Sequence, residues 1–160
     1  AHINATNPNG SKGKIAKEFG GLLRELKQSK VKCIKPAKFI SEFIKVYDMF
    51  KGNDQHDSHE FLSMLLDGLH EDLNRRSEEE KITQSIKLKN PSQQQEIQSS
   101  REQWEQRQGE RGSVISDLCG GQIRNCLICP SCNDKKVRFE HFMDLSVPIP
   151  IKDNDLSIIL

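Results

Sequence analysis

The sequence predicts an α+β fold in which helices precede strands along the chain. Apolar residues recur at three- and four-residue spacing in residues 1–75, which is the period of an amphipathic helix. In residues 113–160 the spacing changes to alternation, which is the period of a strand. Three cysteines at two-residue intervals, Cys126, Cys129 and Cys132, interrupt this second region in a segment suited to a turn.

Three helices are predicted within residues 1–75. The first lies in residues 13–29, and the second begins near Pro36, a residue that suits the first helical position. The third, from Asp57 to Leu73, has the widest apolar stripe. This stripe consists of Phe61, Leu62, Leu65, Leu66, Leu69 and Leu73. Helices with short connections can share one core, so we expect a small helical subdomain.

The middle of the chain, residues 76–112, is rich in Glu, Gln, Ser and Lys and has few residues suited to a core. This composition is typical of a solvated linker or insertion. A short helix is predicted around residues 101–107, anchored by Trp104, the only tryptophan. The β pattern begins at Ser113 and ends near Pro148, which suits an edge or the exit of a strand. Its apolar positions include Val114, Ile115, Ile123, Val137, Phe139, Phe142, Met143, Leu145, Val147 and Ile149.

Composition argues against several classes of protein. The formal net charge is +1, so we expect no nucleic-acid or anionic-membrane partner. No apolar run is long enough for a transmembrane helix, and the first residues do not resemble a signal peptide. Five cysteines without a secretory signal favour metal binding over disulfides and a cytoplasmic or nuclear location.

The clustered cysteines predict a structural zinc site. Cys129-Pro-Ser-Cys132 has the spacing of a zinc knuckle, which supplies two of the four tetrahedral ligands. Cys119 and Cys126 are candidates for the other two. The alternative is a set of free thiols without metal. An iron–sulfur run would need a further cysteine where the sequence has Lys136.

Histidines and Cys33 are weaker candidates for chemistry. His56 and His59 are three residues apart on a predicted helix, but their order, His-x-x-His-Glu, differs from the metalloprotease motif. His70 lies about 16 Å further along the helix axis, too far to share a metal with them. A polar helix start is the better interpretation. Cys33 lies between lysines in a loop, with no base nearby in the sequence.

Four segments together resemble the ubiquitin-specific proteases. Residues 50–75, FKGNDQHDSHEFLSMLLDGLHEDLNR, resemble the family's Gln-Gln-Asp-x-Gln-Glu box and the helix that follows it. Residues 3–26 are similar to its Asn-Pro-x-Gly region, and residues 104–132 to its Trp…Asp-Leu…Cys-Pro-x-Cys stretch. Residues 139–150, FEHFMDLSVPIP, are similar to its Phe-x-x-Phe-Met-x-Leu-Ser motif.

The resemblance implies a partial domain of a papain-like thiol protease that cleaves after the C-terminal glycine of ubiquitin. It implies a helical thumb in residues 1–75, a variable segment in 76–112, and β palm and fingers in 113–160. Cys129 and Cys132 match half of the family's zinc ribbon. The family's catalytic Cys and His boxes have no match in this chain, so we expect the chain alone to be inactive.

The resemblance also implies a binding site for ubiquitin and ubiquitinated proteins. The positions that match the family's contact with the arginine-bearing ubiquitin tail are Gln55, Asp57 and Glu60. Two glutamines of the motif are replaced by His56 and His59. The alternatives are a non-catalytic ubiquitin-binding or scaffold module and a zinc-ribbon interaction protein unrelated to ubiquitin.

Overall fold

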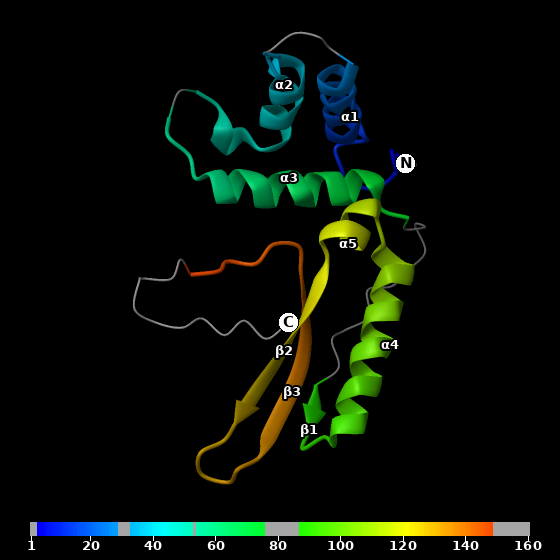
Figure 1. The fold of residues 1–160 in the computed structure, drawn as a ribbon, viewed down its shortest axis with the longest axis vertical. Helices are drawn as coiled ribbons and strands as arrows, with labels where there is room; N and C mark the ends of the chain where they lie inside the picture. Colours follow the sequence, from blue (N-terminus) through cyan, green and yellow to red (C-terminus); the bar gives the residue numbers. More distant parts are fainter. Residues whose placement is uncertain (1–2, 29–32, 53, 76–86, 149–160) are drawn as a thin grey trace.

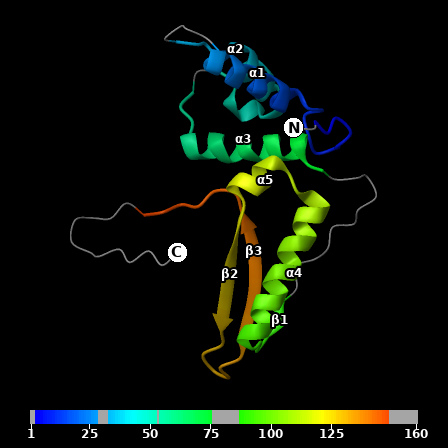
Figure 2. The same cartoon turned by 45° about the vertical axis from the view of Figure 1, so that its right-hand side comes forward.

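The structure is a computed structural model that describes residues 3–28, 33–52, 54–75 and 87–148. Its helices are α1 (Lys14–Gln28), α2 (Ala37–Val46), the 3₁₀ turn η1 (Asp48–Phe50), α3 (Ser58–Leu73), α4 (Gln93–Arg111) and α5 (Val114–Cys119). Its strands are β1 (Leu88–Lys89), β2 (Gly121–Ile128) and β3 (Lys135–Phe142). Helices α1 and α2 lie on one side of α3, and the β2–β3 hairpin extends from the other side (Figures 1 and 2).

The three helices predicted in the first part of the chain are present. They bury a core of Ile15, Phe39, Phe43, Leu65 and Leu69. The ring of Phe43 lies at its centre, with centroids 4.8 Å from both Tyr47 and Phe61. No helix in the described part of the chain is both long and apolar enough to cross a membrane.

A buried carboxylate fixes the start of α1 against the end of α3. Asp72 is fully buried and accepts hydrogen bonds from the backbone N–H groups of Ser11 (2.7 Å), Gly13 (3.1 Å) and Ala16 (3.1 Å). A negative charge is favourable at a helix N-terminus because the unpaired N–H groups there carry partial positive charge. The C-terminal end of α3 is therefore held in place by α1.

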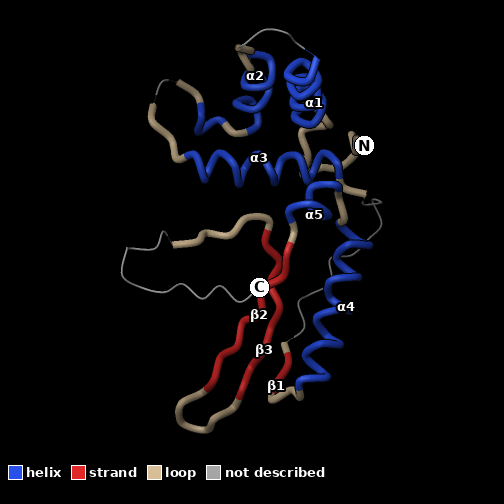
Figure 3. Tube along the Cα trace, viewed as in Figure 1, coloured by secondary structure: helices blue, strands red, loops and turns tan. Residues whose placement is uncertain are grey.

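The strands form an antiparallel sheet in the order β1-β3-β2 (Figure 3). Arg124 of β2 lies opposite Phe139 of β3. Val137 and Phe139 are buried on the face toward α4, whereas Ile123 and Leu127 on the other face are exposed. The strand predicted to reach Pro148 is shorter than expected. It ends at Phe142 because residues 143–148 have no partner strand among the described residues, and Ile149 lies outside them.

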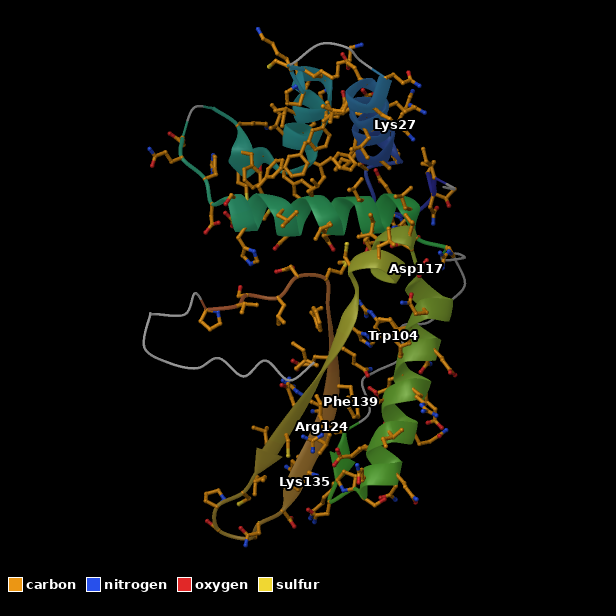
Figure 4. The ribbon with its side chains drawn as sticks, in the orientation of Figure 1. Lys27, Trp104, Asp117, Arg124, Lys135 and Phe139 are labelled. Carbon is orange, nitrogen blue, oxygen red and sulfur yellow. The ribbon has the colours of Figure 1, made fainter. Side chains whose placement is uncertain are left out.

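The middle of the chain differs most from its prediction. A long helix, α4, replaces the solvated linker and short helix expected there, although residues 76–86 lie outside the described part. Ser92 and Gln95 form a capping box that starts α4. Three of its polar residues, Glu96, Ser99 and Gln103, are buried. Glu96 accepts from Arg124 Nε at 2.6 Å and Lys135 Nζ at 2.5 Å, which joins α4 to the sheet. Figure 4 labels Arg124 and Lys135 on the sheet.

Residues 114–119 form a helix rather than the start of the β pattern. The Ser113 hydroxyl accepts from the N–H groups of Ile115 and Ser116, each at 3.1 Å, and Ser116 Oγ accepts from the Ser113 N–H at 2.8 Å. This capping box overrides the β propensity of Val114 and Ile115, which are β-branched. Helix α5 packs on α3 and leads directly into β2, so it connects the helical part to the sheet.

Candidate functional site

The candidate site lies where the start of α3 approaches the segment that follows β3. Its members are Gln55, Asp57, His59, Glu60 and Asp144, and we call this set the junction site. In Figures 1 and 2 the segment after β3 passes beneath the N-terminal half of α3. Residues 54–60 are all exposed. The junction site is therefore accessible to a large ligand.

Asp57 has a structural contact and a carboxylate oxygen that remains open. As the N-cap of α3, it accepts a hydrogen bond from the His59 N–H to its Oδ1 atom at 2.7 Å. Its Oδ2 atom has no hydrogen-bond partner among the described residues. Aspartate is a preferred N-cap because its carboxylate satisfies an unpaired N–H of the first turn. One side chain thus starts the helix and presents a negative charge.

An ion-pair geometry links α3 to the segment after β3. Nε2 of His59 lies 3.3 Å from Oδ2 of Asp144, and the pair is charged only when the imidazole is protonated. Asp144 was not predicted as a site residue. The signal available in the sequence was a lone carboxylate within the apolar run of Phe142, Met143 and Leu145.

The remaining predicted residues at the start of α3 are exposed. Gln55 and Glu60 flank Asp57, which places an amide and a second carboxylate beside it. The His56 ring meets the Phe50 ring edge-on at a centroid distance of 5.0 Å, so it packs against the helical part. The arrangement provides hydrogen-bond acceptors for a cationic ligand.

The four clustered cysteines do not converge. Cys129 and Cys132 share the β2–β3 turn, Cys126 lies within β2, and Cys119 ends α5 at the opposite end of that strand. Eight strand residues span about 25 Å. Among the described residues, no three His, Cys, Asp or Glu side chains are arranged to hold a metal ion. The arrangement therefore offers a two-thiol knuckle rather than a local four-cysteine site.

Cys129 and Cys132 are the two thiols of the turn that could hold a metal ion. Hydrogen bonds from Cys132, and then from Ser131, hold the pKa of the Cys129 thiol below its ordinary value. A turn of this kind stabilises a thiolate, which is the form that binds zinc. Two thiols on one turn can supply two of the four ligands of a tetrahedral metal site.

His70, Cys33 and His141 lie apart from the junction site. His70 is buried, with its Nδ1 atom 2.8 Å from Ser113 Oγ, and Cys33 is exposed before α2. His141 stacks on Trp104 beside a cavity of about 70 Å³ that residues of α3, α4, α5 and the sheet line together. Burial, with a smaller contribution from Arg107, lowers the pKa of His141 to about 4. His70 and His141 therefore pack within the protein, whereas Cys33 lies at its surface.

The helical part and the small antiparallel sheet are consistent with a domain of the ubiquitin carboxyl-terminal hydrolase class. The family model for ubiquitin carboxyl-terminal hydrolase matches residues 1–144. The chain therefore belongs to the ubiquitin carboxyl-terminal hydrolase family, which confirms the resemblance seen in the sequence.

Relatives from plants and animals agree with this assignment. The chain is 39% identical over 148 residues to ubiquitin carboxyl-terminal hydrolase 9 of Arabidopsis thaliana, which covers 92% of the chain and 16% of the relative. It is 35% identical over 152 residues to ubiquitin carboxyl-terminal hydrolase 4 of Pongo abelii, covering 95% and 15% respectively. It is 38% identical over 149 residues to ubiquitin carboxyl-terminal hydrolase 32 of Homo sapiens, covering 93% and 9%. The chain spans about a sixth of the length of the first of these relatives.

Proposed function

We propose that the chain is part of a thiol-dependent deubiquitinase and supplies ubiquitin binding rather than the catalytic residues. The observation that carries the proposal is the family match over residues 1–144. The reaction is thiol hydrolysis of the bond after the C-terminal glycine of ubiquitin. In this proposal the helical part is the thumb, and the sheet belongs to the palm and fingers.

The junction site would bind the C-terminal tail of ubiquitin, which carries arginines. The open Oδ2 atom of Asp57 and the exposed carboxylate of Glu60 would accept from guanidinium groups, and the Gln55 amide would add a neutral partner. Carboxylate–guanidinium hydrogen bonds are among the strong ones in proteins because both partners are charged. This chemistry supports a basic, extended ligand at the start of α3.

The chain's own thiols and imidazoles do not form a Cys–His pair among the described residues. Such a pair needs the sulfur within hydrogen-bond reach of an imidazole. Cys33 is exposed before α2, whereas His70 is bonded to Ser113 and His141 stacks on Trp104. We therefore assign the nucleophile and base to other parts of the full-length protein.

Zinc would have a structural role. Cys129 and Cys132 would hold the metal from the β2–β3 turn, and two further ligands would come from outside this chain. Zinc bound by four ligands stiffens a ribbon by joining two turns. The hairpin would then present its exposed face, with Ile123 and Leu127, to the body of ubiquitin.

The direct test is ubiquitin binding by the full-length protein with Asp57→Asn. Asparagine is also a good N-cap, so the variant removes the charge while keeping the start of α3. We expect the Kd for ubiquitin to rise about tenfold, as for the loss of one charged hydrogen bond. Asp54→Asn, an exposed carboxylate three residues earlier, is the matched control. An unchanged Kd would remove Asp57 from the tail site.

A non-catalytic ubiquitin-binding module is the second candidate. It is favoured by the catalytic Cys and His boxes of the resembling family, which have no match in this chain. Hydrolysis of a fluorogenic ubiquitin substrate by the full-length protein separates the two candidates. A deubiquitinase cleaves the substrate, whereas a scaffold binds ubiquitin without cleaving it. The 160-residue chain alone is expected to be inactive in either case.

A further inference from the structure

A polar cavity lies where the helical part meets the sheet. It has a volume of about 70 Å³, and residues of α3, α4, α5 and the sheet line it. A single buried water needs roughly 10–15 Å³ of cavity, so this cavity has room for a larger polar group. The polar side chains that line it are His70, Trp104, Arg107, Gln108, Ser116 and His141.

His141 has a buried nitrogen without a partner. Its Nδ1 atom is buried and makes no hydrogen bond with any described residue. Buried polar atoms are nearly always hydrogen-bonded in proteins, so such an atom indicates that a further group binds beside it. The His141 ring stacks on Trp104, which points from α4 toward the sheet, with centroids 5.5 Å apart (Figure 4). The ring is thus held beside the cavity, and a group in the cavity is the candidate partner for Nδ1.

The lining of the cavity suits an anion. Arg107 brings a positive charge, and none of the described residues that line the cavity carries a carboxylate. The Oε1 atom of Gln108 accepts from Ser116 Oγ at 3.1 Å, so the amide nitrogen of Gln108 is the end that can donate to a ligand. Burial, with a smaller contribution from Arg107, lowers the pKa of His141 to about 4. Its ring is therefore neutral at pH 7 and can carry its one hydrogen on Nδ1.

We propose that this cavity binds a small tetrahedral oxyanion, with the chemistry of inorganic sulfate or phosphate. Arg107 supplies the opposite charge, and the Nδ1–H of His141 and the amide of Gln108 donate to the oxygens of the anion. No residue of the junction site lines the cavity, so this proposal is independent of the proposed function. Because the lining comes from both parts of the fold, a bound anion holds the helical part against the sheet and slows local opening there.

The experiment measures the Kd of the full-length protein for inorganic sulfate by titration calorimetry at pH 7. Sodium chloride keeps the ionic strength constant, so general screening does not change. Arg107→Gln and His141→Phe should each raise the Kd about tenfold, because each removes a hydrogen bond to a charged group. Phenylalanine keeps an aromatic surface for Trp104 but has no Nδ1 atom. Arg101→Gln is the matched control, because Arg101 is an exposed arginine of α4 that does not line the cavity.

Hydrogen exchange followed by mass spectrometry locates the bound anion. At a sulfate concentration ten times the Kd, exchange through local opening should slow about tenfold in residues 116–121 of the unaltered protein. At the same concentration it should slow only about twofold in Arg107→Gln, because the Kd of that variant is ten times higher. Arg107 is exposed, so this variant is expected to fold. Arg101→Gln should show the same slowing as the unaltered protein.

Three results would overturn the proposal while leaving the proposed function intact. The absence of saturable sulfate binding would mean that the cavity holds water only. A Kd that either Arg107→Gln or His141→Phe leaves unchanged would mean an adventitious ion only, bound elsewhere on the protein. An equal rise in Kd for Arg101→Gln and Arg107→Gln would mean that sulfate responds to the overall charge of α4 and not to the cavity.

Discussion

The Nδ1 atom of His70 lies 2.8 Å from the Oγ atom of Ser113, and both side chains are buried between the helical part and the sheet. The Ser113 hydroxyl already accepts from the N–H groups of Ile115 and Ser116. Its single hydrogen is therefore directed to His70 Nδ1, which accepts it. One hydroxyl starts α5 and also satisfies a buried imidazole of α3.

Ser113→Ala should destabilise the protein more than the loss of an ordinary helix cap. Loss of the cap costs about 1 kcal/mol, and the unsatisfied Nδ1 of His70 costs about 1–3 kcal/mol more. Ser92→Ala is the matched control, because Ser92 caps α4 with the same capping box but is exposed. Urea unfolding should show a loss of about 2–4 kcal/mol for Ser113→Ala and about 1 kcal/mol for Ser92→Ala. Equal losses would mean that His70 finds another partner.

The attachment of α4 to the sheet should weaken in acid. Hydrogen bonds from Arg124 and then Lys135 lower the pKa of Glu96 to about 2. Because this pKa is below the ordinary value of 4.5, the stabilisation is complete above about pH 4.5 and is lost as the pH falls toward 2.

Glu96→Gln tests this attachment. The variant should have a lower urea midpoint than the unaltered protein at pH 7, and the difference should shrink between pH 4.5 and pH 2. Glu105→Gln, an exposed glutamate on the same helix, should leave the midpoint unchanged at both ends of that range. A constant difference at every pH would show that the Glu96 charge is not the cause.

Apolar periodicity predicted the helices of residues 1–75 well because these helices pack together through apolar side chains. It failed for α4 because that helix attaches to the sheet through Glu96, Arg124 and Lys135, and charged partners leave no apolar stripe. It also failed at Ser113, where a side-chain hydroxyl decides the local structure and hydrophobicity does not.

The candidate site was predictable in part for a similar reason. Asp57 was found from its sequence motif, and its place at the start of α3 follows from N-cap chemistry. Asp144 was missed because it is 85 residues from His59 in the sequence, and only the fold brings the two together. The separation of Cys119 from Cys129 likewise depends on the strand between them, which spacing in the sequence does not reveal.

Among the cysteines of this chain, only Cys129 and Cys132 of the turn should affect the zinc content. In the full-length protein, Cys129→Ser and Cys132→Ser are each expected to reduce bound zinc to near zero, measured by mass spectrometry, because each removes one of the four ligands of a tetrahedral site. Cys119→Ser and Cys126→Ser are the matched controls and should retain the metal. Loss of zinc from either control would instead support a local four-cysteine site and a rearrangement of the hairpin.

His141 should make stability fall in a different pH range from Glu96. Its pKa is lowered to about 4 by burial and, to a smaller extent, by Arg107. His141 therefore binds a proton more readily in the unfolded chain than in the folded protein. The stabilisation is complete above about pH 6.5 and is lost as the pH falls toward 4.

The variant His141→Phe separates the effect of protonating His141 from the effect of the packing of its ring. Phenylalanine keeps an aromatic surface for Trp104, whose ring centroid lies 5.5 Å from that of His141, but it cannot be protonated. Urea midpoints of the variant should change less than those of the unaltered protein between pH 6.5 and pH 4.5. His56→Gln removes an exposed histidine and should keep the original dependence. The Glu96 contribution is lost only below about pH 4.5, so it does not affect this comparison. If the urea midpoints of His141→Phe and the unaltered protein fall in parallel between pH 6.5 and pH 4.5, a group other than His141 causes the acid sensitivity.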